Sequence, residues 1–107
     1  LAWQTPLEQW AVIEVYPAAT LAAHGVPSTG YKKQEQLPQR REIAQRLADV
    51  MPGLAGWVTG PADAFDACLC LLCAWDFLEG VAVGPTREER ELAEEEGWIW
   101  VRGPQPD

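Results

Sequence analysis

Three carboxylates in two separate segments form the pattern in this sequence that is most suggestive of chemistry. Asp63 and Asp66 are three residues apart near the start of an apolar stretch, and Glu14 lies within the alternating segment Trp10–Tyr16. A spacing of three places both aspartates on one face of a helix, with Cβ atoms about 5–6 Å apart. Glu14 stands in a strand pattern with apolar residues on both faces, so it needs a cation, a metal, a donor or an edge position.

Carboxylate oxygens of this kind suit Mg²⁺ or Mn²⁺, and such a site activates water and stabilises a displacement at phosphorus. The sequence therefore offers Glu14, Asp63 and Asp66 as a candidate metal cluster. Asp63 also has a simpler interpretation, because an acid in the first turn of a helix stabilises it by about 0.3–1 kcal/mol. Asp66 is one turn deeper and is harder to explain in that way.

Other catalytic patterns are weak. The one histidine and the one serine, His24 and Ser28, are four residues apart, and neither a nucleophile elbow nor a glycine-rich phosphate loop is present. The three cysteines lie in the apolar stretch without a histidine nearby, which favours reduced core thiols. A redox role for Cys70 and Cys73 requires an exposed thiolate of low pKa, and their apolar setting argues against it.

The basic residues are clustered although the chain carries a net charge of −8. Five of the eight lysines and arginines fall within fifteen positions, namely Lys32, Lys33, Arg40, Arg41 and Arg46. The helical pattern over 34–50 predicts that the arginines form its solvated face, and a local anion-binding patch is the alternative. The overall acidity disfavours a general nucleic-acid-binding protein, since such binding depends on basic side chains.

The elements predicted to position these residues form a single α/β domain over 1–107. A stretch without glycine or proline predicts a long, buried central helix near 61–79, too short and too polar at its start to cross a membrane. Alternation predicts a small sheet with strands near 10–16 and 97–102, flanked by further helices. No signal peptide or targeting segment is visible, which favours a cytoplasmic protein without a membrane partner.

Three segments, taken in order, resemble a widespread family of predicted nucleases. They are IEVYPAATLAAHGVPSTGYKK, PADAFDACLCLLCAWDFLEGVAVGP and EEGWIWVR. The combination is similar to domain-of-unknown-function family 429, which is assigned an RNase H-like fold. The resemblance implies metal-dependent phosphodiester hydrolysis of a nucleic acid, in which Glu14, Asp63 and Asp66 hold Mg²⁺ or Mn²⁺. It also implies that Lys32 or Lys33 lies near the phosphates.

One essential aspartate of the RNase H-like pattern has no counterpart here. Only thirteen residues precede Glu14, and the acid among them, Glu8, lies in no matching strand. The chain thus resembles the C-terminal part of the family's domain, a partial RNase H-like fold. Missing strands would expose a sheet edge, which predicts a homodimer. The alternative to an enzyme is a non-catalytic oligomeric or partner-binding module derived from that fold.

Overall fold

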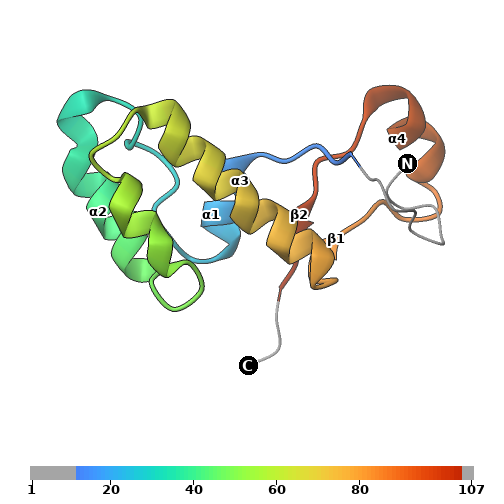
Figure 1. The fold of residues 1–107 in the computed structure, drawn as a ribbon. Coiled ribbons are helices and arrows are strands. Elements are labelled where there is room, and N and C mark those ends of the chain that lie inside the picture. The colour runs from blue at the N-terminus through green and yellow to red at the C-terminus, as the bar shows by residue number, and fades with distance from the viewer. Residues whose placement is uncertain (1–11, 105–107) are drawn as a thin grey trace.

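The structure is a computed structural model that describes residues 12–104 (Figure 1). Within this range the elements in chain order are α1 (Pro17–Ala23), the 3₁₀ helix η1 (Gln34–Gln36), α2 (Leu37–Arg46), the 3₁₀ helix η2 (Pro52–Trp57), α3 (Ala62–Leu78), β1 (Ala82–Val83), α4 (Arg90–Glu96) and β2 (Val101–Arg102). The mixture of helices with a small sheet agrees with the α/β class. None of the described helices has the length and apolar character needed to span a membrane.

Helix α3 is the long central helix that the sequence predicts, with nearly the predicted bounds. Its burial is one-sided, however. Phe65 and Leu69 are buried in the core, whereas Leu71, Trp75 and Leu78 are 64%, 57% and 69% exposed. The prediction of a buried helix therefore holds for one face only, because an apolar sequence alone does not reveal which faces have a packing partner.

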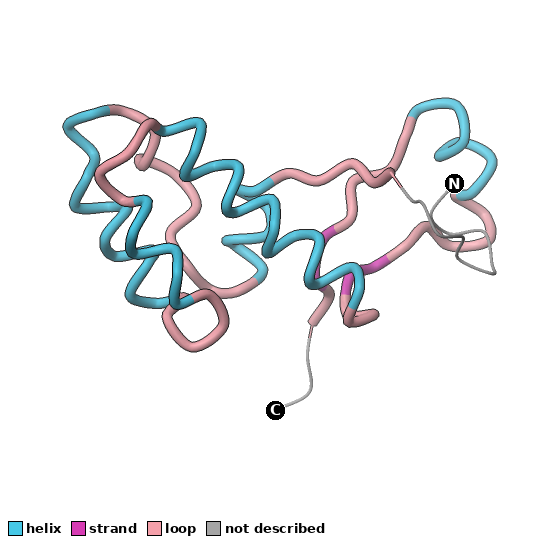
Figure 2. The backbone as a smooth tube through the Cα atoms, in the orientation of Figure 1, coloured by secondary structure: helices cyan, strands magenta, loops and turns pink. Residues whose placement is uncertain are grey.

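The core lies between α1, α2, η2 and α3. Leu21 of α1, Ile43 of α2 and Leu54 of η2 are almost fully buried and belong to one cluster with the inner face of α3. The chain is more extended than a compact domain, with a radius of gyration of 15.0 Å, against about 13 Å expected for this length. Figures 1 and 2 show why, since α4 lies apart from the other helices.

The sheet is smaller than the sequence predicts. Strands β1 and β2 are antiparallel, with Ala82 opposite Arg102 and Val83 opposite Val101. The described part of the predicted strand near 10–16 is extended and makes one parallel bridge, Glu14 with Ile99. β1 lies outside both predicted strands, so tertiary contact rather than the local sequence pattern determines this pairing (Figure 2).

Arg40 is the main exception to the predicted surface pattern. Arg41 and Arg46 are exposed as expected, but Arg40 is only 1% exposed. Its guanidinium donates five hydrogen bonds, all to backbone carbonyls, which belong to Tyr31, Lys32, Lys33, Val58 and Gly60. A planar guanidinium can donate hydrogen bonds to several carbonyls at once, and buried carbonyls need such a donor because they have no contact with water. Arg40 thereby ties α2 to two loops.

We predict that Arg40→Met lowers the free energy of unfolding by about 3–5 kcal/mol, because it leaves buried carbonyls without donors. Arg41→Met is the matched control, since it removes the same charge from an exposed position of the same helix, and we expect it to change stability by less than about 0.5 kcal/mol. Urea unfolding followed by circular dichroism measures both. Equal effects of the two substitutions would contradict the anchoring role of Arg40.

Candidate functional site

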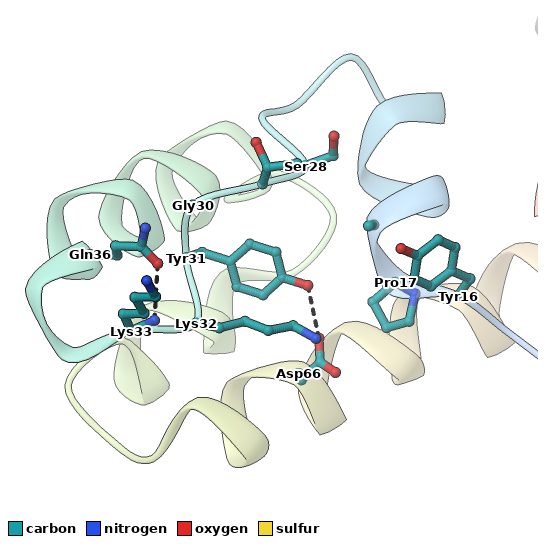
Figure 3. Close-up of a pocket in the computed structure, with 11 residues that line it drawn as sticks. Tyr16, Pro17, Ser28, Gly30, Tyr31, Lys32, Lys33, Gln36 and Asp66 are labelled. Atoms are coloured by element: carbon teal, nitrogen blue, oxygen red, sulfur yellow. Dashed lines mark hydrogen bonds between the residues drawn. The ribbon is translucent and has the colours of Figure 1, made fainter.

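A hollow of about 410 Å³ lies where α1, the loop before η1 and α3 meet (Figure 3). We call it the lysine hollow. Its walls combine two aromatic rings, two cations, a carboxylate and several small polar groups. The lining residues are Tyr16, Pro17, Ala18, Ser28, Thr29, Gly30, Tyr31, Lys32, Lys33, Gln36 and Asp66. One of the three predicted carboxylates and both predicted substrate-binding lysines therefore line the same hollow.

Tyr31 and Asp66 are joined by a hydrogen bond within the lining of the hollow. The Tyr31 hydroxyl donates to Asp66 Oδ1 at 2.9 Å. The Tyr31 ring is buried and packs on Phe65 with the ring centroids 5.9 Å apart. Burial, reinforced by the hydrogen bond to Asp66 and by its charge, raises the pKa of Tyr31 well above its usual value. Tyr31 is thus a neutral donor that holds Asp66 in place.

Lys32 and Lys33 are exposed at the rim of the lysine hollow. Their backbone is fixed by Arg40, and the Lys33 amide also donates to Gln36 Oε1 at 3.0 Å. In Figure 3 the Lys32 side chain extends toward Asp66. Two cations and one carboxylate give this hollow a local positive balance on a chain whose net charge is −8. The arrangement favours an anionic ligand.

Glu14 lies in a different hollow. This second hollow measures about 290 Å³ and is also lined by Glu94, Glu95 and Glu96 of α4. The Glu14 carboxylate packs over Gly97, where an added Cβ would lie 2.6 Å from Oε1. Its backbone oxygen accepts a hydrogen bond from the Trp100 amide at 3.0 Å. The side chain is therefore directed to an acidic surface beside α4.

Asp63 is exposed in the first turn of α3 and lines neither of these hollows. Over residues 12–104 no group of three or more His, Cys, Asp or Glu side chains is arranged to hold a metal ion. The described residues therefore do not fit the Mg²⁺ or Mn²⁺ site that the resemblance implies. The catalytic and metal-binding roles of Glu14, Asp63 and Asp66 stay predictions.

Sequence reasoning missed the two tyrosines of the lysine hollow. The signal was present in the segment GYKK, where Tyr31 immediately precedes the two lysines.

The cysteines offer no competing site. Cys73 is buried and donates to Thr20 Oγ1 at 3.2 Å, and burial raises the pKa of both the Cys70 and the Cys73 thiol. A raised thiol pKa is the opposite of what a reactive thiolate requires.

Comparison with protein families decides the relationship that the sequence motifs suggest. The model of a family described as "Protein of unknown function (DUF429)" matches residues 2–90. The chain belongs to the DUF429 family. No curated protein and no solved structure matches the chain. Membership in DUF429 carries no assigned activity, so the nuclease description and the RNase H-like fold stay predictions.

We predict that Tyr31 makes the stability of this DUF429 chain fall as the pH rises in the alkaline range. The pKa of Tyr31 is higher in the folded than in the unfolded chain. Its contribution to the free energy of unfolding is therefore fully present below about pH 10 and is lost as the pH rises further. Between about pH 9.5 and pH 11, the free energy of unfolding should therefore fall more steeply for the wild type than for Tyr31→Phe.

Asp66→Asn serves as the second comparison for this measurement, and we expect an intermediate slope. It removes the charge that adds to the effect of burial but leaves the Tyr31 ring buried. Urea unfolding at a series of pH values gives all three slopes. A Tyr31→Phe slope equal to that of the wild type would show that the Tyr31 hydroxyl is not held in its neutral form by the fold.

Proposed function

We propose that this chain is a binding module of the DUF429 family whose lysine hollow takes a nucleotide or the end of a single nucleic-acid strand. The observation that carries the proposal is the pair Lys32 and Lys33 at the rim of a hollow that also holds an exposed aromatic ring, Tyr16. Basic side chains beside an exposed aromatic ring are the usual means of binding single-stranded nucleic acid, since phosphates pair with the cations and a base stacks on the ring.

The size of the ligand follows from the charge distribution. A long polyanion bound at Lys32 and Lys33 would have to pass over a chain with sixteen acidic and eight basic residues. A nucleotide or a strand end places its phosphate in the lysine hollow alone. Repulsion from the rest of the surface is screened beyond about 8–10 Å at physiological salt. The proposal thus reconciles a phosphate site with a net charge that opposes general nucleic-acid binding.

Asp66 provides the polar selectivity of the hollow. One carboxylate oxygen accepts from Tyr31, and a carboxylate has room to accept further hydrogen bonds. A ribose hydroxyl of the ligand can donate such a hydrogen bond to Asp66. The resemblance implies phosphodiester hydrolysis with Mg²⁺ or Mn²⁺ at Glu14, Asp63 and Asp66, but the described residues do not bring these side chains together. We therefore propose binding without hydrolysis.

We predict that Lys32→Met and Lys33→Met each weaken the binding of a nucleoside monophosphate by about tenfold, because each removes a charge-assisted contact to phosphate. Arg46→Met is the matched control. It removes an exposed cation that pairs with Glu42 and lies outside the lysine hollow, so the affinity should stay within about twofold of the wild type. Isothermal titration calorimetry measures the affinities in the presence of a chelator.

The same calorimeter distinguishes binding from metal-dependent hydrolysis. We expect no saturable heat when the chain is titrated with Mn²⁺ alone, and the same result with Asp66→Asn. Saturable Mn²⁺ binding that is lost in Asp66→Asn would contradict the proposal and favour the metal-dependent nuclease. Equal nucleotide affinity of the wild type, Lys32→Met and Lys33→Met would exclude the lysine hollow as the site.

We also propose that two copies of this chain associate through the exposed side of α3. Leu71, Trp75 and Leu78 follow a helical spacing of four and three and form a continuous apolar stripe. The three side chains of the stripe carry no charge, so two copies related by a two-fold axis would place apolar groups opposite each other along it. This contact surface replaces the exposed sheet edge as the predicted interface of the homodimer.

We predict that Leu71→Glu converts a dimer into a monomer, since it places like charges opposite each other at the two-fold axis. Leu92→Glu is the matched control, because Leu92 is an exposed leucine of α4 and lies outside the stripe. Sedimentation velocity over a range of concentrations measures the association. A wild-type chain that is monomeric throughout, or a dimer that survives Leu71→Glu, would refute this interface.

A further inference from the structure

A third hollow has a charged floor and shares no lining residue with the lysine hollow. It measures about 220 Å³, and we call it the Asp76 hollow. Its floor is polar and its walls are largely apolar. The lining residues are His24, Val50, Leu72, Trp75, Asp76, Glu79, Val81 and Arg102. None of them lines the proposed nucleotide site, and only Trp75 belongs to the proposed dimer stripe.

The floor is a three-residue network built from three elements. Asp76 of α3 accepts from His24 Nε2 at 2.8 Å, at the C-terminal end of α1, and from Arg102 Nη1 at 3.2 Å, on β2. Asp76 is among the most buried side chains in the described part of the molecule. A buried ion pair is weak support for stability, because its desolvation often cancels its attraction. A network of this kind beside a hollow is therefore a candidate for binding.

Arg102 is the more accessible partner of the ion pair at the floor of the hollow. The Arg102 side chain is 28% exposed, whereas the Asp76 side chain is 3% exposed. A guanidinium has five N–H donors in a fixed plane, so it can pair with a second carboxylate while it holds Asp76. His24 donates through Nε2 to the same Asp76, which fixes the ring and leaves Nδ1 as an acceptor in the neutral imidazole.

The walls restrict what can accompany the anion. Val50 and Trp75 are more than half exposed at the rim, and Leu72 and Val81 complete an apolar lining. Such a surface accepts an aromatic or branched aliphatic group. Glu79 also lines the hollow and is exposed, so it repels a second negative charge. The hollow is thus unsuited to a phosphate dianion.

We propose that the Asp76 hollow is a second ligand site, which takes a small monocarboxylic acid with an apolar group. Arg102 binds the carboxylate, Asp76 holds the guanidinium and is itself held by His24, and Trp75 packs on the apolar part. This site is independent of the nucleotide site in the lysine hollow, because the two hollows have no residue in common.

The test uses phenylacetate as the probe and compares it with the neutral phenylacetamide and the cationic 2-phenylethylamine. Amide and side-chain N–H signals of the ¹⁵N-labelled chain report both the affinity and the place of binding. We expect phenylacetate to shift the signals of Arg102 and Trp75 and to bind at least about tenfold more tightly than phenylacetamide. Tighter binding of 2-phenylethylamine, equal binding of phenylacetamide, or shifts confined to the lysine hollow would overturn the proposal.

Three variants separate the contributions. Arg102→Gln should lower the affinity for phenylacetate by about tenfold, and Trp75→Ala by about threefold or more. Because Trp75 is exposed, its truncation keeps the test decisive even where Arg102→Gln fails to fold. Glu79→Gln should tighten binding by about twofold, since it removes a like charge from the rim. Weaker phenylacetate binding by Glu79→Gln would show that Glu79 does not repel the bound carboxylate and would refute the proposal.

Discussion

The hydrogen bonds of Arg40 are the interaction on which the rest of the structure depends. One buried guanidinium satisfies carbonyls of the segment 31–33 and of the turn before α3. These two segments are far apart in the sequence, and neither has regular secondary structure where it contacts Arg40. Loops of this kind leave carbonyls that helices and strands would otherwise pair. Arg40 supplies those donors from α2 and so fixes both the start of α3 and the backbone of the two lysines.

Features that depend on short-range chemistry could be predicted from the sequence. The start of α3 after Pro61 and its end at Gly80 follow from the backbone preferences of these two residues, and Gly80 has the expected φ of 77°. Thr86 and Glu89 exchange the two hydrogen bonds of a capping box. In each case the residues that make the contact are neighbours in the chain, so the local sequence pattern already contains the interaction that forms the structure.

Features that depend on long-range contacts could not be predicted in this way. Nothing in the helical pattern distinguishes the buried Arg40 from the exposed Arg41, because the carbonyls that make burial of Arg40 favourable lie outside α2, and those of Val58 and Gly60 are far away in the sequence. The same limit applies to the carboxylates. The spacing of Asp63 and Asp66 fixes their relation to each other, but the direction of Glu14 depends on its pairing with Ile99 and on the space above Gly97. Residue types suggested a metal site, whereas the tertiary arrangement of the described residues separates its members.

Trp75 belongs both to the apolar stripe of α3 and to the rim of the Asp76 hollow. A second copy that covers the stripe would therefore also cover one wall of that hollow. Association and occupancy of the hollow then compete for the same ring, and linkage requires each to weaken the other by the same factor. A chain with this geometry would release the carboxylic acid from the Asp76 hollow as the protein concentration rises. A change in oligomeric state would then change the ligand occupancy, and the reverse.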